Sequence, residues 1–169
     1  MTPAIITTRA LQRQETAMIR LIYSSALNPA YSPQSLLGLL AGYRARNQRL
    51  GINSLLLLMN KDFLQMLEGE EAAVDELYDF IQRDKHHLQL TLLSRETVSY
   101  PSFPGQPLVF IDTEELARKL GHPVHLSNIA PHGELDHAER AKRFVQEFIN
   151  GKWHHHLANG LNPQVVHRR

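Results

Sequence analysis

The sequence predicts an α+β sandwich of the ferredoxin-like kind, with additional helices at its C-terminal end. Strand-like and helix-like segments alternate in the order βαββαββ between residues 18 and 111. Residues 52–59 are a continuous apolar run, which is typical of a strand buried on both faces. Two more helical segments follow residue 112. We expect two crossover helices on one face of the sheet, and the C-terminal helix or a second subunit on the other.

The first elements can be read from apolar spacing and helix-end signals. Residues 1–17 are polar and irregular and are expected to form an N-terminal arm, and residues 18–25 form the first strand. Ser32 is a plausible N-cap, because Pro33 follows it at the first helical position. Apolar residues at helical spacing then predict one continuous helix, which stops at Gly51.

The middle of the chain predicts a hairpin, a helix and a fourth strand. Residues 60–62 form the turn between the apolar run and its hairpin partner, residues 63–68. Two glutamates follow Gly69 and open the second helix at its positive end. That helix ends within residues 84–87, and residues 88–98 form the fourth strand.

The remaining elements follow a proline-rich loop at residues 101–107. We expect a short strand at 108–111, then helices at 113–120 and 134–150. The predicted domain organisation is an arm (1–17), a central α+β domain (18–111), a helical extension (112–151) and a flexible tail (152–169).

Composition excludes several classes of protein. The chain has 169 residues, a net charge of +1 and no cysteine, so we expect neither a nucleic-acid surface nor a zinc–thiolate site. It has no apolar run of about 18 residues and no signal-peptide pattern, so we expect a cytoplasmic protein without membrane association. The run His154–His156 is interpreted as a surface tract, because no upstream residues supply a fixed ligand set; no metal is expected.

The most informative residue is Gln65, a carboxamide inside the apolar strand 63–68. A buried amide without partners costs about 1–3 kcal/mol, so either a planar ligand or a neighbouring group must hydrogen-bond it. Because side chains alternate along a strand, Phe63, Gln65 and Leu67 share one face. If the first and third strands are neighbours, Tyr23 and Gln65 meet and form a hydrogen-bonded pair.

Three ordered motifs resemble the BLUF domain, a flavin-binding sensor of blue light. They are Leu21–Ser25 (LIYSS), Arg44–Ile52 (RARNQRLGI) and Phe63–Gly69 (FLQMLEG), and the resemblance spans roughly residues 18–110. It implies a flavin, expected to be FAD but with FMN or riboflavin as alternatives, between the two crossover helices. It also implies that the output is a partner regulatory protein or a change of homo-oligomer, with no enzyme on this chain.

The resemblance also assigns roles to individual residues. Tyr23 matches the photoactive tyrosine and Gln65 the switching glutamine, while the expected cofactor-binding residues are Tyr23, Asn47, Gln65, Asp84, His86 and His87. It implies that light drives an electron and then a proton from Tyr23, relayed through Gln65, which is left rotated or tautomerised. The changed hydrogen bonds shift flavin absorption to the red and bias the sheet and C-terminal helices.

Several positions depart from the BLUF pattern. The departures at or near the flavin site are Asn53, Ser54, Phe80, His86, Gln106 and Leu108. Losing one charge-assisted hydrogen bond costs about 1.5–3 kcal/mol, so a flavin-free BLUF-like interaction module is an open alternative. A third alternative, a hydrolase using Ser94, His86 and Asp84, lacks any nucleophile-elbow or metalloprotease motif.

Overall fold

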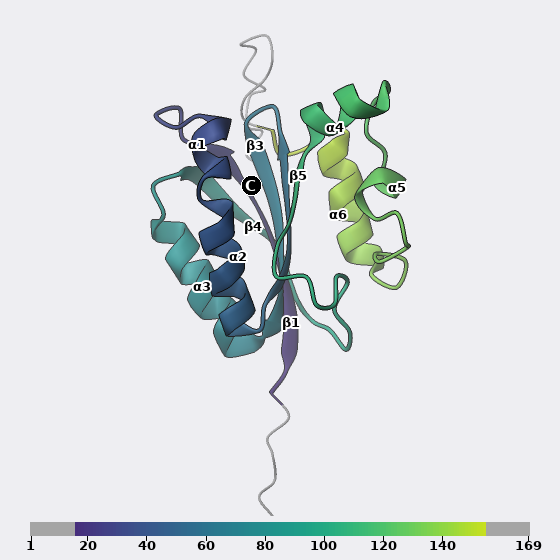
Figure 1. Ribbon diagram of the computed structural model, residues 1–169. Helices are drawn as coiled ribbons and strands as arrows, with labels where there is room; N and C mark the ends of the chain where they lie inside the picture. The colour runs from purple at the N-terminus through teal and green to yellow at the C-terminus, as the bar shows by residue number, and fades with distance from the viewer. Residues whose placement is uncertain (1–15, 155–169) are drawn as a thin grey trace, which may run out of the picture.

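The computed structural model describes residues 16–154 and contains one mixed sheet with helices on both faces (Figure 1). No helix in this part of the chain is long and apolar enough to cross a bilayer. The elements are β1 (Met18–Leu27), α1 (Pro33–Leu37), α2 (Leu40–Leu50), β2 (Asn53–Met59), β3 (Asp62–Glu70), α3 (Glu71–Arg83), β4 (His87–Thr97), β5 (Val109–Asp112), α4 (Thr113–Leu120), α5 (Leu126–Ile129) and α6 (Glu139–Ile149).

The predicted ferredoxin-like α+β fold with added C-terminal helices is confirmed. The five strands lie in the order β4-β1-β3-β2-β5, and β1 and β3 are antiparallel neighbours at the centre. β2 and β3 form a hairpin whose turn residues, Asn60 and Lys61, have φ values of 52° and 65°. Positive φ at both turn positions is typical of a tight two-residue hairpin. β5 adds to the far edge, parallel to β2.

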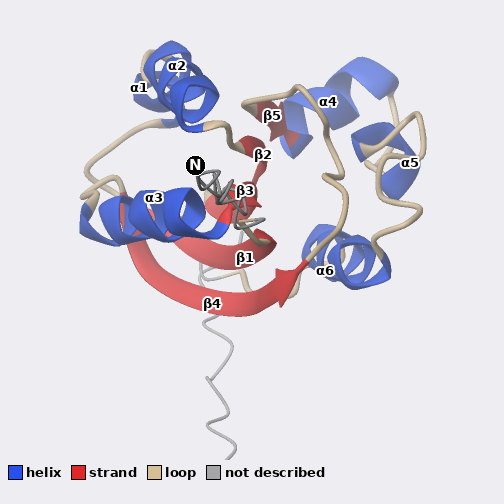
Figure 2. Ribbon diagram, turned by 90° about the horizontal axis from the view of Figure 1, so that it is seen from below, coloured by secondary structure: helices blue, strands red, loops and turns tan. Residues whose placement is uncertain are grey.

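Both faces of the sheet are covered by helices of this chain (Figure 2). α1, α2 and α3 lie on one face, and α4, α5 and α6 lie on the other. In β2 the apolar side chains divide between the faces: Leu55 and Leu57 pack in the cluster that contains Phe148 of α6, whereas Leu56 packs with Leu36 of α1. The C-terminal helices therefore cover the second face, which sequence reasoning left open between those helices and a second subunit.

The helices differ from the sequence prediction in two places, while the strand ends shift by one or two residues. The helix predicted from Pro33 to about Leu50 is two helices: α1 ends at Leu37, before Gly38, a poor helix former, and α2 starts at Leu40. Gly51 ends α2 as predicted, with a φ of 67°. The last helix begins at Glu139 instead of residue 134, since the preceding turn buries Leu135 and Ala138 in the core.

The short helix α5 was missed by sequence reasoning. It has only four residues, too few for an apolar period, and a capping box holds it: Asn128 Oδ1 accepts a hydrogen bond from the His125 backbone N–H at 2.9 Å. After α6, Trp153 packs on Phe144 and the His154 ring bonds the Phe148 carbonyl at 3.0 Å. The rest of the predicted tail and residues 1–15 of the predicted arm lie outside the described residues.

Candidate functional site

Tyr23 and Gln65 meet at the centre of the sheet. They are direct cross-strand partners on β1 and β3, and the Tyr23 hydroxyl donates a hydrogen bond to Gln65 Oε1. Both side chains are buried, on the face covered by α2 and α3. The predicted convergence of phenol and carboxamide is thus present, and the pair is arranged to pass a proton from oxygen to oxygen.

The surroundings of Tyr23 keep its hydroxyl protonated. Burial raises the pKa of Tyr23 well above its usual value of 10.0, and the neighbouring Tyr78, whose ring centroid is 5.5 Å away, raises it further. The positive charge of Arg46 opposes both effects. The phenol is therefore protonated at neutral pH and available as a hydrogen-bond donor.

Gln65 also lines a pocket on the side of the sheet covered by the first three helices. Its other walls come from β2, α1, α2, α3, the start of β4 and the loop before β5; they are Leu36, Tyr43, Arg46, Asn47, Leu56, Ile81, Asp84, His87 and Leu108. The cavity itself has a volume of only about 20 Å³, although the whole space between the walls, including the part open to solvent, is about 360 Å³. A ring system therefore enters only if side chains on these walls move apart.

Asn47, one of the pocket walls, has an unpaired acceptor. Its amide nitrogen donates to Ser54 Oγ at 3.1 Å and to the Pro107 carbonyl at 2.9 Å, and the Ser54 hydroxyl donates to the same carbonyl at 2.7 Å. Asn47 Oδ1 is buried without a hydrogen-bond partner. Because a buried amide oxygen is normally paired, this atom points to an external N–H donor.

At the end of α3, Asp84 organises two neighbouring side chains. Its Oδ1 accepts hydrogen bonds from the His86 backbone N–H at 2.9 Å and from the His86 ring at 2.6 Å, and its Oδ2 lies 3.5 Å from the Tyr43 hydroxyl. Burial raises the pKa of Asp84, but the two His86 hydrogen bonds, together with the charge interactions of His87 and His86, outweigh burial, so the pKa falls. Burial and the Asp84 charge raise the pKa of Tyr43 to about 12.

His87 is a neutral ring at the edge of the pocket. Its Nδ1 lies 3.0 Å from Ser25 Oγ, and its ring packs on Phe63 at a centroid distance of 5.2 Å. Burial lowers the pKa of His87 from 6.5 to about 4, against the attraction of Asp84 and with a smaller contribution from His86.

The low pKa of His87 predicts a specific loss of stability in acid. The unfolded chain takes up the proton near pH 6.5 and the folded protein only near pH 4, so the free energy of unfolding falls as the pH drops between these values. The loss is at most about 3 kcal/mol, since the ring is partly exposed. Urea unfolding of the wild type and His87→Gln at pH 7 and pH 4.5 should show a smaller pH dependence in the variant; equal dependence would contradict this assignment.

Five of the six predicted site residues lie in the pocket or next to it, and the sixth does not. Asn47, Gln65, Asp84 and His87 line the pocket, and Tyr23 contacts it through Gln65. His86 instead faces Asp84 and packs on Tyr31 in a tilted arrangement, with ring centroids 4.2 Å apart. Of the residues that depart from the family pattern, Leu108 lines the pocket, Ser54 bonds Asn47, and Gln106 is exposed.

Arg46 and Tyr43 are pocket residues to which sequence reasoning gave no site role. Their spacing of three residues places them on one helix face, and Asn47, next to Arg46, was already a candidate. That spacing was the available signal.

The hydrolase alternative, which uses Ser94, His86 and Asp84, is not supported by geometry. Ser94 lies seven residues along β4 from His87, the neighbour of His86, which is a distance of about 23 Å. Among residues 16–154 no group of three or more histidine or acidic side chains is positioned to hold a metal ion.

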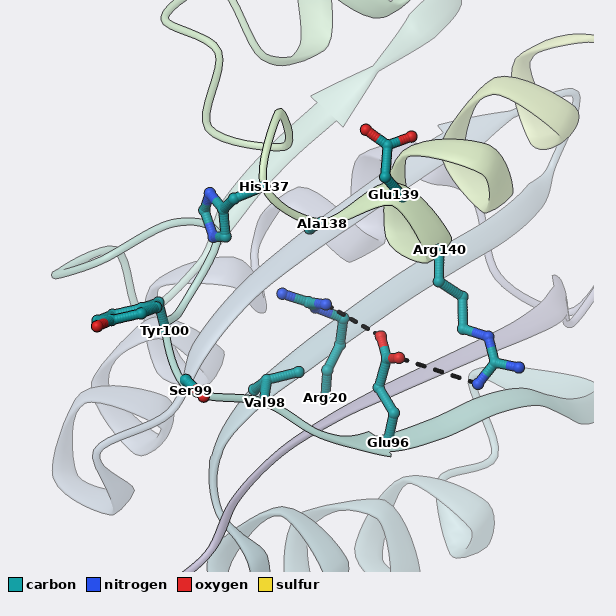
Figure 3. A pocket seen from close by; sticks show the side chains of 9 residues that line it. All are labelled: Arg20, Glu96, Val98, Ser99, Tyr100, His137, Ala138, Glu139 and Arg140. Atoms are coloured by element: carbon teal, nitrogen blue, oxygen red, sulfur yellow. Dashed lines mark hydrogen bonds and ion pairs between the residues drawn. The ribbon is translucent and has the colours of Figure 1, made fainter.

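A second cavity lies on the opposite face, between β4 and α6 (Figure 3). It has a volume of about 480 Å³, and Arg20, Glu96 and Arg140 are among its walls. Buried Arg20 bonds Glu68 at 2.6 Å, Glu96 at 3.0 Å and the Ser102 hydroxyl at 2.9 Å. Glu96 also lies 3.9 Å from Arg140 of α6. Arg20 and Glu68 are cross-strand partners on β1 and β3, three residues from Tyr23 and Gln65.

Comparison with protein families identifies a match over residues 18–108 to the family described as "BLUF: Sensors of blue-light using FAD". A comparison with curated proteins finds no match.

Three solved structures illustrate the similarity. "BlrP1 BLUF" has a TM-score of 0.67 and 27% identity, covering 87% of this chain and 99% of that chain. The dark-state structure of BlrB, described as a BLUF protein, has a TM-score of 0.59 and 26% identity, covering 79% of this chain and 98% of that one. BlrP1 of Klebsiella pneumoniae, solved with FMN and cyclic diGMP, has a TM-score of 0.62 and 27% identity over 79% of this chain. The present chain covers 35% of that longer protein.

Proposed function

The chain belongs to the BLUF family, and on that premise we propose that it is a blue-light photoreceptor that binds a flavin beside α2 and α3 and signals through Tyr23 and Gln65. The observation that carries the proposal is the buried hydrogen bond from Tyr23 to Gln65, next to a pocket that Gln65 itself lines. A phenol and a carboxamide in this arrangement are the minimum needed for a light-driven change of hydrogen bonds.

The chemistry of the pocket suits the flavin ring system. An isoalloxazine has a large apolar face and an edge of carbonyl and N–H groups, and it supplies absorption of blue light and an excited state that accepts an electron. Leu36, Leu56, Ile81 and Leu108 offer apolar contacts for the face. Asn47 Oδ1, buried and unpaired, is an acceptor for an N–H on the edge.

Tyr23 and Gln65 supply the switch. When Tyr23 gives up one electron, its hydroxyl becomes strongly acidic, and the proton passes along the existing hydrogen bond to Gln65 Oε1. When the electron returns, the proton returns to Tyr23, and the carboxamide is left rotated or in its other tautomer. Gln65 then presents a different pattern of donors and acceptors to the pocket, with no net change in atoms or charge.

An absorption spectrum of the purified protein tests this function. We expect flavin bands after purification or after addition of FAD, FMN or riboflavin, and a small red shift on blue illumination that reverses in the dark. A colourless protein that takes up none of these three flavins would contradict the proposal.

One observation favours a second candidate, the flavin-free interaction module. The pocket walls lie so close together that the cavity between them has a volume of only about 20 Å³. If the walls stay closed in solution, the same fold acts as a scaffold that binds a regulator. The flavin titration above distinguishes the two functions.

We propose that the C-terminal helices transmit the change at Tyr23 and Gln65 to a regulatory protein or to a second copy of the chain. Arg20 and Glu68 lie on the two switch strands, and Glu96 connects Arg20 to Arg140 of α6. A shift of β1 relative to β3 at Tyr23 and Gln65 would therefore move Arg20 relative to Glu68 and alter the ion pairs that lead to α6. Size-exclusion chromatography in the dark and under blue light measures the homo-oligomer directly.

A further inference from the structure

We propose that the outer surfaces of α2 and α3 form a self-complementary docking surface, on which two copies of this chain associate about a two-fold axis. Both helices lie on the same face of the sheet, opposite the face covered by the C-terminal helices (Figures 1 and 2). The contact is therefore separate from the proposed output, which uses α6. It goes beyond the proposed function, because it needs neither flavin nor light.

α2 carries only positive charge. Its sequence, LAGYRARNQRL, has three arginines and no acidic residue. Arg44 and Arg49 are exposed, and within residues 16–154 no carboxylate forms an ion pair with either of them. Arg44 donates a hydrogen bond to the Leu108 carbonyl at 3.3 Å, which leaves its charge uncompensated. The outer surface of α2 thus presents cations without a counter-ion from the described part of the chain.

The outer surface of α3 carries the opposite charge. Glu76 and Asp79 are exposed, and their spacing of three residues places them on one side of the helix. Neither carboxylate forms an ion pair among the described residues, because Arg95 pairs with two other carboxylates of α3. Arg83, in the last turn, donates to the Asp79 backbone carbonyl at 3.2 Å and not to a carboxylate. Unpaired anions on α3 therefore lie on the same face of the sheet as the unpaired cations of α2.

Opposite charges on neighbouring helices make this face complementary to itself. In a two-fold dimer both copies use the same patch, so the axis either exchanges the two helices or places each helix on its own copy. The second arrangement sets the arginines of α2 against those of the other α2, and they repel. The first places α2 of each copy on α3 of the other, so that every attractive contact is formed twice. Charge therefore selects the dimer in which the helices are exchanged.

The shape of this face also permits a second copy to approach. Ala41, Gly42 and Ala45 are exposed positions of α2 without long side chains, and a Cβ on Gly42 would meet no atom within 4 Å. Phe80 of α3 is 50% exposed, and its ring contacts Arg46 of α2. A second copy that covers the face removes this ring from water. The surface thus combines an apolar contact with paired charges.

Sedimentation velocity of the purified protein in the dark tests the docking surface. We expect the wild type to be in equilibrium between monomer and dimer, with a dimer Kd that rises with salt because exposed charges are screened. Reversing the charge of α2 with Arg44→Glu/Arg49→Glu should raise Kd about 10- to 100-fold, and reversing α3 with Glu76→Arg/Asp79→Arg should do the same.

Arg118→Glu/Arg143→Glu is the matched control. It reverses two exposed arginines of α4 and α6, on the opposite face of the sheet, and should leave the dimer Kd unchanged. Thermal unfolding of each variant checks its fold. If the α2 variant is unstable, Arg44→Gln/Arg49→Gln replaces it, with a smaller rise in Kd because the charges are removed and not reversed.

Mixing the two charge-reversed proteins gives the sharpest result. Alone, each sets like charges against each other at both contacts of the dimer. In a mixed dimer one copy presents two acidic helices and the other presents two basic helices, so both contacts are attractive again. We expect association with a Kd close to that of the wild type, and native mass spectrometry identifies the mixed dimer by its mass. Mixing would not repair damage to the fold of either copy.

Four outcomes would overturn the proposal. They are a wild type that stays monomeric, association that neither reversal weakens, a mixture that does not associate, and growth beyond a dimer, which a closed two-fold contact does not allow. A loss of association in the α4 and α6 control would place the contact on the opposite face. A photoactive monomer would overturn this contact alone, and a colourless dimer would overturn the photoreceptor function alone.

Discussion

Tyr23→Phe abolishes the light-induced red shift while leaving flavin bound. The substitution removes one oxygen atom, the donor in the hydrogen bond to Gln65 Oε1, and keeps the buried ring that packs on Tyr78. Leaving the Gln65 oxygen without its donor costs about 1–3 kcal/mol, which a domain of ordinary stability tolerates. The light-minus-dark absorption spectrum of the flavin-loaded variant measures the loss directly.

Tyr78→Phe is the matched control for this experiment. Its ring also packs beside Tyr23, but Gln65 accepts its hydrogen bond from Tyr23 and not from Tyr78. We expect the Tyr78 variant to keep the red shift. A shift of wild-type size in Tyr23→Phe, with flavin bound, would remove Tyr23 from the mechanism and with it the proposed switch.

Glu68→Ala lowers the free energy of unfolding by about 3–5 kcal/mol. The exposed fractions of the Arg20 and Glu68 side chains are 5% and 1%, and Glu68 Oε1 accepts from Arg20 Nε at 2.6 Å. Glu68 also accepts from the Ser102 backbone N–H at 2.6 Å and from its hydroxyl at 2.8 Å. Among the residues that the structure describes, truncation leaves the buried Arg20 with Glu96 as its one ionic partner, and it removes the acceptor of the Ser102 N–H.

Glu71→Ala provides the comparison, because it breaks an ion pair of similar length at the surface. Glu71 pairs with Arg95 at 2.6 Å, but the two side chains are 49% and 39% exposed. Solvent screens such a pair, so its loss costs about 0–1 kcal/mol. Urea unfolding of the two variants measures the difference. Similar losses in both would show that Arg20 does not depend on Glu68 for its burial.

Local sequence patterns predicted most of the sheet and its central pair. Alternation in residues 63–68 placed Gln65 on one face, and the strand order of the ferredoxin-like fold brought Tyr23 opposite it. The double-sided burial of residues 52–59 followed from their lack of polar alternation. Helix boundaries were less predictable: the break at Gly38 and the short helix α5 depend on one or two residues, too few to change a periodic pattern.

By itself the sequence determined the order of strands and helices along the chain, the two apolar faces and, once the first and third strands are neighbours, the partnership of Tyr23 with Gln65, because these depend on period-two alternation and on a standard topology. Only the tertiary structure decided which groups share an environment across the fold. It placed Arg46 between Tyr43 and Phe80, turned His86 toward Asp84, and joined Arg20 to Ser102. Such contacts are made by long, flexible polar side chains that extend from one element to another. Their conformations are determined by packing and by the need to pair buried charges.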